Sequence, residues 1–353
     1  MSSDFFYQDK SVFGLDIGYS SLKVMQIDAQ PKRQDVSGYG VATFDHAAIK
    51  DGVIVDPEAL AKATKSLFDS HMVGEITTKR VNMSVPAAHT FTRPMTLPAL
   101  NPKDLVEAVR LEAEQYIPIP IDDLYLDYTI TKSTKENIDV LAVAVPKKVV
   151  DSYLTLANIL GLEVVCIEST IIAGTRLFLQ AEQSDAPAVL IDFGSMSTDI
   201  TIYDRGVTVT GTVLGGGDSL TAAIADYLKV SRQEAHIIKT KYGLGVSKKQ
   251  AEILEATKPV LDLLLKELRR MIRYYEERSG TERKISQAVT MGGGANMPGL
   301  SDYLTNHLRI AVRMIDPWQR LHFGDLQPPN RMEKSTYITV AGLALVKPKE
   351  LFA

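Results

Sequence analysis

The sequence predicts an α/β protein built from two related halves. A hairpin with the pattern Asp-x-Gly in its turn occurs twice, at 13–28 and at 188–203. Elsewhere, stretches with strand periodicity alternate with helical stretches, which is the pattern of α/β proteins. A length of 353 residues is long for one core and indicates about two domains.

The second hairpin is the motif around which the chain is organised. An apolar run at 188–191 predicts a buried strand, small and polar residues follow Asp192, and a second strand resumes at Asp199. Such a turn can direct backbone N–H groups, hydroxyls and one carboxylate at a single point. Because amides bind an anion and a carboxylate holds the water shell of a cation, the pattern indicates a site for a phosphate with its metal ion.

The first hairpin repeats this layout. Its Asp16, Gly18 and Ser21 take the places of Asp, Gly and Ser in the second copy. One position differs, since Lys23 stands where the second copy has Asp199. A single Asp-x-Gly is better explained as an ordinary turn. Two copies in matching register favour two halves that hold one nucleotide between them.

The composition narrows the class of protein. Hydrophobic content is 45% and net charge is -4, which fits a globular protein and gives no basis for nucleic-acid binding. The single cysteine, Cys166, excludes an intramolecular disulfide and fits a reducing compartment. The N-terminus has no signal-peptide pattern, and no apolar run is long enough to span a bilayer. We therefore expect a cytoplasmic protein without direct membrane insertion.

The remaining elements follow from helix caps and strand periodicity. The helix at 57–71 has Asp56 as its N-cap and a proline at its first position, and Gly161 ends another helix. Four basic residues lie on a long amphipathic helix, where glutamates beside them favour a solvated face over a phosphate site. The expected strands are 36–44, 80–86, 162–167, 207–213 and 288–291. The expected helices are 57–71, 147–160, 171–183, 220–229, 231–242, 259–277, 300–308 and 337–346.

A separate compact module is expected at 91–146. It has one helix, which begins at Asn101-Pro102, and two strands at 124–132 and 137–145. Between them, alternating Ile and Pro at 117–121 keep the segment out of a helix or a central strand. The segment is either a partner surface or a rigid connector, and the residues alone leave both open.

Two glycine runs lie in the second half. The run 215–217 precedes a helix, where backbone N–H groups and the positive helix end can face an anion. The run 292–294 follows a strand, where the missing Cβ lets a flat base or a phosphate approach closely. The sequence has no P-loop and no His/Cys cluster with metal-ligand spacing.

This order of parts resembles the actin superfamily, in which two related domains close on ATP and magnesium. The two hairpins are similar to its two phosphate motifs, and 290–299 is similar to its adenosine motif. The resemblance implies an actin-like, ribonuclease H-like duplicated ATPase fold. The module at 91–146 then corresponds to the inserted 1C subdomain (SHS2 domain) of the cell-division protein FtsA.

Within the superfamily, the chain resembles the PilM family of type IV pilus assembly proteins. The stretch RLEAEQYIPIP at 110–120, continued by Asp127-Tyr128, carries this resemblance, with Val85-Pro86, Phe91 and Arg93 adding to it. FtsA proteins end in a linker and an amphipathic membrane-targeting helix. The few residues after Lys347 are too short for such a helix, which favours PilM.

The PilM resemblance implies a cytoplasmic ATP-binding adaptor of the inner-membrane platform that assembles type IV pili and supports twitching motility. Its partner is the cytoplasmic N-terminal tail of PilN, which recruits it to the inner face of the inner membrane. The tail is expected in a groove between subdomains 1A and 1C. Other platform proteins, motor ATPases and a second copy of the chain are further candidate partners. The implied subdomains are 1A (1–90, 147–186, 331–353), 1C (91–146), 2A (187–230, 283–330) and 2B (231–282).

Residue roles follow from the same resemblance. The phosphates are expected to meet Gly18, Ser20, Ser21, Lys23, Gly194, Ser195, Ser197 and Thr198. Magnesium is expected to be held through water by Asp16 and Asp192. The ribose and phosphate are expected to face Gly216 and Gly217. The base and ribose are expected to border Lys239, Gly292, Gly293, Gly294, Ala295 and Asn296. The partner groove is expected to involve Val81, Val85, Tyr116, Ile117, Pro118 and Ile119.

Two positions leave alternatives open. Glu168 is expected to orient water for slow ATP hydrolysis, or else the stretch Glu168-Ser169-Thr170 serves as an N-terminal helix cap. His236 stands where relatives often carry a Glu that binds the ribose, and a neutral imidazole cannot make both acceptor contacts. Alternative functions are an FtsA-like filament-forming or cell-division ATPase and a small-molecule kinase of the same fold. The inserted module and the lack of an obvious substrate-binding insert count against the kinase.

Overall fold

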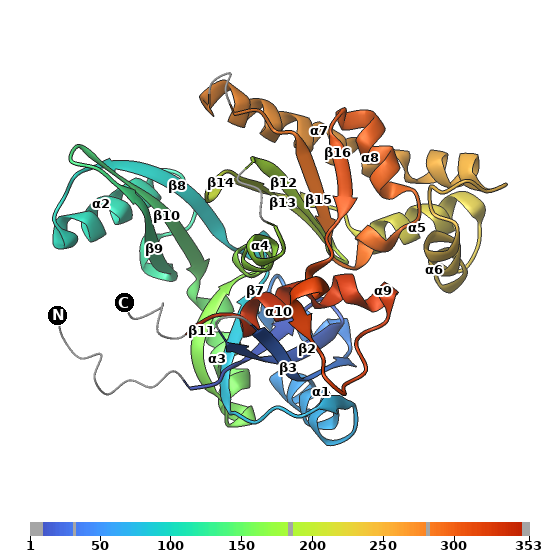
Figure 1. Cartoon of the computed structure of the whole chain (residues 1–353), viewed down its shortest axis with the longest axis horizontal. Helices are drawn as coiled ribbons and strands as arrows, with labels where there is room; N and C mark the ends of the chain where they lie inside the picture. The colour runs from blue at the N-terminus through green and yellow to red at the C-terminus, as the bar shows by residue number, and fades with distance from the viewer. Residues whose placement is uncertain (1–9, 31–32, 183–185, 280–282, 348–353) are drawn as a thin grey trace.

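The computed structural model describes residues 10–30, 33–182, 186–279 and 283–347 (Figure 1). The expectations about a signal peptide and about the last six residues fall outside these ranges. Within them, no helix is both long enough and apolar enough to cross a membrane.

The first half is built on a seven-stranded mixed sheet. Its strand order is β11-β7-β1-β2-β3-β17, and β6 also pairs with β3. The strands are β1 (Phe13–Ile17), β2 (Ser21–Gln30), β3 (Arg33–Thr43), β6 (Met72–Gly74), β7 (Arg80–Val85), β11 (Glu163–Ser169) and β17 (Leu321–His322). A small hairpin beside it consists of β4 (Ile49–Lys50) and β5 (Val53–Ile54). The pairing of β17 with β3 places Leu321 in the first sheet, whereas the sequence assigned 283–330 to subdomain 2A.

Helices cover both faces of this sheet. On one face, α1 (Pro57–Ser70) and α3 (Lys147–Leu160) pack their apolar stripes into a shared core. The Asp56 side chain accepts a hydrogen bond from the Ala59 N–H, so the expected N-cap of α1 is confirmed. On the other face lie α4 (Thr170–Ala181) and α10 (Ile338–Ala344), whose core also includes residues of the second sheet. Figure 1 shows these two helices between the two large sheets.

The second half repeats the arrangement with a five-stranded sheet. Its order is β14-β13-β12-β15-β16. The strands are β12 (Ala188–Phe193), β13 (Ser197–Tyr203), β14 (Val207–Leu214), β15 (Gln287–Met291) and β16 (Ala311–Met314). The outer core is shared with α5 (Gly217–Leu228), α6 (Arg232–Lys241), α7 (Gln250–Ser279) and α8 (Leu300–Leu308). A short helix, α9 (Arg331–Lys334), precedes α10.

The stretch after β7 forms a third, three-stranded sheet with its own core. Its order is β8-β10-β9, and α2 (Pro102–Glu114) packs on it. The strands are β8 (Phe91–Pro98), β9 (Leu124–Ser133) and β10 (Asn137–Pro146). Figure 1 shows this unit extending to one side of the two large sheets. It also touches the second half, because the Thr210 hydroxyl of β14 donates to the Thr92 carbonyl at 3.0 Å.

The expected bounds of the long helix were wrong. The sequence placed its start at Pro259, but α7 begins at Gln250 and continues through the proline. The reason is packing, since Ile253 and Ala256 extend the buried stripe that Leu261 continues. A proline inside a helix removes one hydrogen bond, and here the burial of that stripe outweighs the loss. The short strands β6, β16 and β17 were not expected.

Candidate functional site

The first hairpin places a lysine opposite an aspartate. Asp16 and Lys23 are cross-strand partners, and Lys23 Nζ lies 3.6 Å from Asp16 Oδ2. Ser84 Oγ donates to the other carboxylate oxygen of Asp16 at 2.8 Å. The turn closes through the Gly18 N–H, which donates to the Ser21 carbonyl. Lys23 also donates to Ser21 Oγ at 3.3 Å, so its ammonium group is held at the turn.

The second hairpin places two aspartates opposite each other. Asp192 and Asp199 are cross-strand partners. Burial raises the pKa of Asp192 to about 7, with contributions from Asp199 and Asp16, while Lys23 lowers it. Burial also raises the pKa of Asp199 to about 6, against hydrogen bonds from Thr212 and Thr170. Because Asp16 and Lys23 act on Asp192, the structure brings the two hairpins together as the sequence predicted.

The rest of the second hairpin is fixed by its own backbone. The Thr198 hydroxyl donates to the Gly215 carbonyl at 2.9 Å, so this hydroxyl points at the glycine run. The side chains of Ser195 and Ser197 are partly exposed at the turn. A Cβ on Gly194 would lie 2.9 Å from the Ser197 carbonyl oxygen, which explains a glycine at this place in the turn.

The first glycine run, 215–217, is hydrogen-bonded to the turn of that hairpin. The N–H groups of Gly217 and Asp218 donate to the carbonyls of Gly194 and Ser195, each at 2.9 Å. A Cβ on Gly216 would lie 2.4 Å from the Gly194 carbonyl oxygen, so this close approach requires glycine. The sequence expected the amides here to face an anion, but in this conformation the Gly217 amide is already used.

Lys239 is buried against the same helix start. Its Nζ donates to the Gly217 carbonyl at 2.6 Å and to Thr221 Oγ1 at 2.8 Å. Burial lowers the pKa of Lys239, and Asp218 opposes this shift. The pKa of neighbouring His236 is lowered by burial and by Lys239. Lys239 was expected to border the base and ribose, and in this structure its ammonium group is held at the end of the first glycine run.

The second glycine run passes directly over Asp192. Gly292 has a φ of +80°, and a Cβ there would lie 2.2 Å from Asp192 Oδ1. The residues that follow form a 3-10 turn at Gly293–Asn296, in which Ala295 is buried. Asn296 Nδ2 donates to the Met332 carbonyl at 2.7 Å and to Ser335 Oγ at 2.6 Å, which joins this loop to the chain that leads into α10.

The carboxylates fit a magnesium ion only in combination with other ligands. Among the described residues, no group of three His, Cys, Asp or Glu side chains is placed to hold a metal. Asp16 and Asp192 approach from opposite hairpins. Mg²⁺ is commonly bound by one or two carboxylates together with phosphate oxygens and several waters. These two carboxylates fit that mode.

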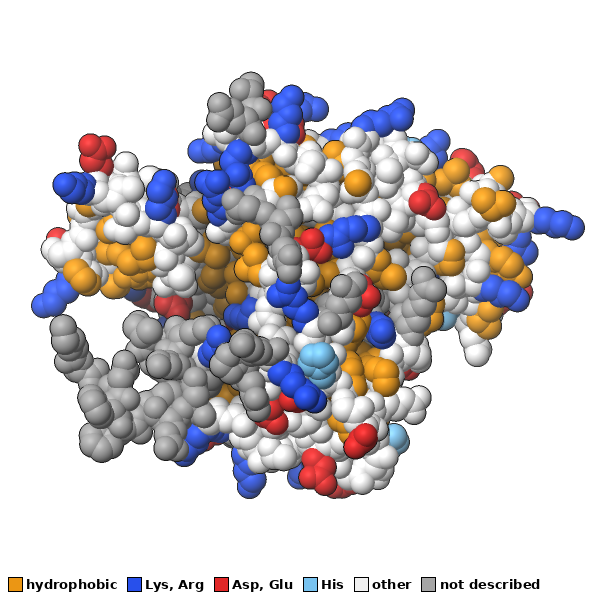
Figure 2. Space-filling model, viewed as in Figure 1, with side chains coloured by type: hydrophobic (Ala, Val, Ile, Leu, Met, Phe, Trp, Pro, Cys, Tyr) orange, Lys and Arg blue, Asp and Glu red, His pale blue; other side chains and the backbone are white. Residues whose placement is uncertain are grey.

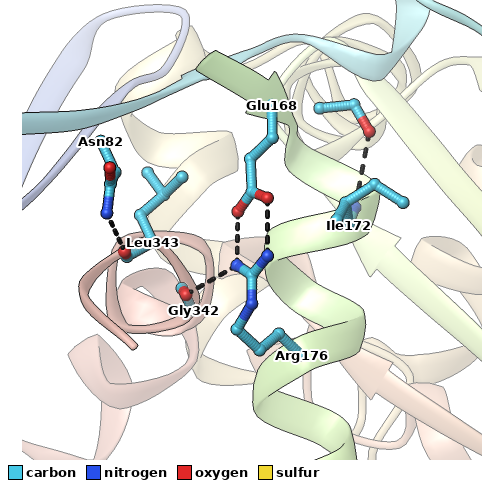
Figure 3. Close-up of polar contacts among 7 residues, drawn as sticks. Asn82, Glu168, Ile172, Arg176, Gly342 and Leu343 are labelled. Carbon is cyan, nitrogen blue, oxygen red and sulfur yellow. Dashed lines mark hydrogen bonds and ion pairs between the residues drawn. The ribbon is translucent and has the colours of Figure 1, made fainter. Parts of the chain in front are cut away.

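Glu168 lies at the junction of β11 and α4, paired with an arginine (Figure 3). Arg176 Nη1 and Nη2 donate to the two carboxylate oxygens of Glu168 at 2.5 and 2.7 Å. Arg176 also donates to the Gly342 carbonyl of α10 at 2.9 Å. The cap of α4 is Ser169, whose Oγ accepts from the Ile172 N–H, so the expected cap within 168–170 is confirmed and is Ser169, not Glu168.

The residues expected in the partner groove divide into two sets. Val81 and Val85 are 0% and 1% exposed, so the expectation that they line the groove surface was wrong. They lie on β7, a central strand whose two faces are both covered by helices, so they belong to the core. In the Ile-Pro segment, Ile117 is buried, Ile119 is half-buried and Pro118 is exposed.

Tyr116, just before that segment, is held by an arginine. Arg93 of β8 stacks over the Tyr116 ring, with its Cζ 4.2 Å from the ring centroid. Burial raises the pKa of Tyr116, and Arg93 opposes this shift. The pair fixes the end of α2 against the three-stranded sheet.

Comparison with known proteins identifies the family. The sequence profile of the family described as "Type IV pilus assembly protein PilM" matches residues 14–347. The chain belongs to this family. The PilM match covers the two hairpins, both glycine runs and the three-stranded sheet, so it extends over all three sheets of the fold.

Other known proteins are similar to this chain over most of its length. FtsA of Bacillus subtilis (strain 168) is 26% identical over 352 residues, which cover 84% of this chain and 77% of FtsA. A structure described as a PilM-PilN type IV pilus biogenesis complex superposes with a TM-score of 0.83 at 24% identity, covering 96% of this chain and 98% of that one. MreB5 of Spiroplasma citri bound to ADP gives a TM-score of 0.52 at 14% identity, covering 97% and 95%. These likenesses confirm the predicted actin-like fold.

The sequence missed several polar residues near the second hairpin. Thr212 and Thr170 both donate to Asp199, which itself was not assigned a role. The one signal in the sequence is the exchange of Lys23 for Asp199 between the two hairpins. Nothing in the sequence predicts a role for Arg176, because its partners Glu168 and Gly342 belong to β11 and α10, which are far apart in the chain.

Proposed function

We propose that this chain is an ATP-binding adaptor of a type IV pilus assembly platform, and that it binds the cytoplasmic N-terminal tail of PilN. The observation that carries the proposal is the match to the PilM family over residues 14–347. The superposition on a PilM-PilN complex over 96% of the chain supports the partner. On this proposal the protein works in the cytoplasm and reaches the inner face of the inner membrane through PilN.

ATP with Mg²⁺ would occupy the cleft between the two hairpins. Lys23 supplies a positive charge for the phosphates, and Asp16 and Asp192 hold the water shell of the metal ion. The second glycine run lies directly against Asp192, since a Cβ on Gly292 would collide with its carboxylate. The Gly217 N–H donates a hydrogen bond to the Gly194 carbonyl in this conformation. A contact between this N–H and a phosphate therefore requires the turn to shift.

The PilN tail would lie where the first sheet meets the three-stranded sheet. In the described residues β11 is the last strand of the first sheet, and most of its residues are partly exposed. An edge strand offers unpaired backbone groups to an extended peptide, and pockets beside it select side chains. Asp127 of β9 lies close enough to Cys166 of β11 to affect its pKa, so the two sheets meet at this edge.

Apolar surface near this junction supports a peptide partner. Figure 2 shows hydrophobic side chains gathered where the three-stranded sheet and α2 lie in Figure 1. Exposed residues of this unit include Leu111 of α2 and Tyr125 and Ile130 of β9. We keep the division into subdomains 1A, 1C, 2A and 2B as part of this proposal, with β17 moved to 1A. The proposed tail site then lies between 1A and 1C.

A calorimetric titration with a synthetic PilN tail peptide, with and without Mg-ATP, tests the proposal. We expect saturable binding by the wild-type chain and at least about ten-fold weaker binding by Ile119→Glu, which adds a charge in the segment that the sequence assigned to the partner groove. Val246→Glu is the matched control, because Val246 is fully exposed and lies in the second half. Absence of binding in both nucleotide states, by a chain that binds ATP, would refute the adaptor. ATP-dependent sedimentation in that case would favour a filament-forming protein.

A further inference from the structure

The outer surface of α7 carries a concentration of basic side chains. We define the basic face as the exposed residues Lys266, Arg269, Arg270, Arg273 and Arg278. The whole chain has a net charge of -4, so this surface differs in sign from the protein that carries it. Figure 2 shows Lys and Arg side chains along the edge of the molecule where α7 lies in Figure 1. Such an uneven distribution creates a local positive potential that attracts anionic partners.

The packing of α7 determines where these charges point. Leu264 and Leu268 are 3% and 0% exposed, in the core that α7 shares with the second sheet. Side chains three, four and seven residues apart share one face of a helix, so Lys266, Arg270 and Arg273 lie together. All three are exposed, on the side away from that core. The buried stripe therefore holds the basic face outward.

Acidic residues on α7 cancel only part of this charge. The sequence favoured a solvated face because glutamates accompany the basic residues. In the structure, Glu267 accepts from Arg270 Nε at 2.9 Å, and only 25% of the Glu267 side chain is exposed. Glu276 is half-buried. The exposed carboxylates are Asp262, one turn before the basic face, and Glu277 near its end. The middle of the face therefore stays positive.

The other basic side chains divide into free and fixed ones. Lys266 and Arg273 form no salt bridge with any residue that the structure describes. Arg278 lies over the Tyr274 ring, with its Cζ 5.0 Å from the ring centroid, and donates to the Tyr274 hydroxyl at 2.6 Å. Arg269 donates to a backbone carbonyl of α8 at 3.0 Å. Two charges are thus available to a partner, and two are held in place at the sides.

Two apolar side chains lie among these charges. Leu263 is 57% exposed and Tyr274 is 43% exposed. With Lys266 and Arg270 they follow steps of three and four residues, so all four share one side of α7. Basic residues combined with an exposed leucine and an aromatic ring are typical of helices that lie on a lipid surface. There the ring and the leucine reach the headgroup boundary, and the cations meet the phosphates.

The shape of the basic face favours a bilayer over an acidic peptide. A peptide is usually held in a groove or along a strand edge, whereas this face is the convex side of a helix. Anionic headgroups form an extended sheet of negative charge that such a side can approach along its length. Each basic residue near that sheet contributes about 1 kcal/mol of attraction.

We propose that the basic face of α7 binds the anionic phospholipid headgroups of a membrane surface, with Leu263 and Tyr274 at headgroup level. The inference rests on the proposed function, because a chain tethered by the PilN tail stays close to the inner membrane, where a weak lipid contact becomes effective. A flexible tail limits the distance from the membrane but not the orientation. The lipid contact supplies the orientation by turning α7 toward the bilayer.

Sedimentation of the full chain with vesicles tests the basic face without PilN or nucleotide. We compare vesicles of phosphatidylcholine with vesicles that also contain phosphatidylglycerol. We expect at least about five-fold more bound protein on the anionic vesicles, and high salt should remove the difference by screening. The double variant Lys266→Glu with Arg273→Glu should lose this preference. Lys62→Glu with Lys65→Glu is the matched control, because it makes the same change of charge on exposed α1, remote from α7 in Figure 1.

A tryptophan in place of Leu263 reports the contact itself. Trp318, the one native tryptophan, is 7% exposed, so the added ring is the one that reaches the surface. We expect the emission of Leu263→Trp to shift to shorter wavelength on the anionic vesicles. Binding without that shift would contradict the placement of Leu263 at headgroup level.

Two other results would overturn the proposal. The first is equal sedimentation with both vesicle types, or an unchanged preference in the double variant of α7. The second is binding of soluble poly-glutamate through Lys266 and Arg273 without binding of vesicles, which would assign the face to an acidic protein. Because neither PilN nor ATP is present, the vesicle result is independent of the titration that tests the adaptor.

Discussion

Asp192 and Asp199 face each other across the second hairpin, at the places that Asp16 and Lys23 occupy in the first. The first pair is an ion pair with 3.6 Å between Lys23 Nζ and Asp16 Oδ2. The second pair brings together two like charges, and burial raises the pKa of both carboxyls. The first hairpin therefore carries an ammonium group beside its carboxylate, and the second hairpin carries a second carboxylate in that place. This asymmetry fits a cleft that closes on a phosphate with its metal ion.

Replacing Lys23 tests that cleft directly. We expect Lys23→Ala to weaken Mg-ATP binding by more than about ten-fold, which is at least ~1.4 kcal/mol, because it removes the one ammonium group of the first hairpin turn. Asp192→Ala should weaken it similarly through loss of the metal's water shell. The measurement is calorimetric titration with Mg-ATP. Lys50→Ala, on the exposed strand β4, is the control that should bind normally. Wild-type affinity in both cleft variants, with folding intact by circular dichroism, would remove the nucleotide from this cleft.

The contribution of Asp192 and Asp199 to the stability of the chain should fall as pH rises from about 4 to 7. The folded chain holds protons on Asp192 and Asp199 up to pH about 7 and 6, whereas the unfolded chain loses them near 3.8. In that window the folded state binds more protons, so these two groups make the free energy of unfolding decrease with pH, by about 7 kcal/mol together. Asp192→Asn, which stays neutral, should flatten this dependence.

Urea denaturation at pH 5 and pH 8 measures the effect. Nucleotide and magnesium are left out of the buffer. Since histidines also titrate in this range, the informative quantity is the difference between the wild type and Asp192→Asn. An identical pH dependence in the two proteins would show that Asp192 ionises normally in the folded chain.

The parts of the fold that local chemistry determines were predicted well from the sequence. The start of α1 follows from Asp56 and Pro57, and the hairpin at 13–28 follows from a tight turn between two apolar runs. The family resemblance supplied the order of the parts, which the PilM match confirmed.

What the sequence could not supply depends on packing between distant segments. Nothing local shows that β7 is a central strand, so Val81 and Val85 were assigned to a surface that they do not reach. The stripe that carries α7 through Pro259 depends on its contact with the second sheet. The partners of Glu168 come together only when α4 packs on other elements.

Breaking the Glu168–Arg176 pair should affect stability more than turnover. Arg176→Ala leaves the carboxylate of Glu168, 10% exposed, without its bidentate partner and frees the Gly342 carbonyl. We expect a loss of about 2 kcal/mol, below the range for fully buried pairs because the Arg176 side chain is 25% exposed. Chemical denaturation measures this, with Arg110→Ala on exposed α2 as control.

Glu168→Gln separates the structural role from catalysis. If ATP turnover is measurable and Glu168→Gln leaves it unchanged, Glu168 has no catalytic role and serves to join β11 to α10 through Arg176. A selective loss of turnover with normal ATP affinity would instead place Glu168 at the attacking water. The wild type and Glu168→Gln are compared at equal folded fraction, because unfolded protein lowers the measured ATP turnover without any change at the site.

The crossing of α4 and α10 should tolerate no added atom at Gly342. A Cβ built there would lie 2.0 Å from the Ala173 carbonyl oxygen, and neither helix backbone can retract without moving away from a large sheet. We expect Gly342→Ala to cost about 2–3 kcal/mol by forcing the helices apart, despite the better helix propensity of alanine. Gly174→Ala in α4 is the matched control, because the nearest atom to its added Cβ is the flexible Met291 Sδ at 3.3 Å. Urea denaturation should show the loss only in Gly342→Ala, and equal stability of the two variants would mean that the helices separate easily. Because these two helices lie between the sheets, Gly342→Ala should also weaken Mg-ATP binding, whereas Gly174→Ala should not.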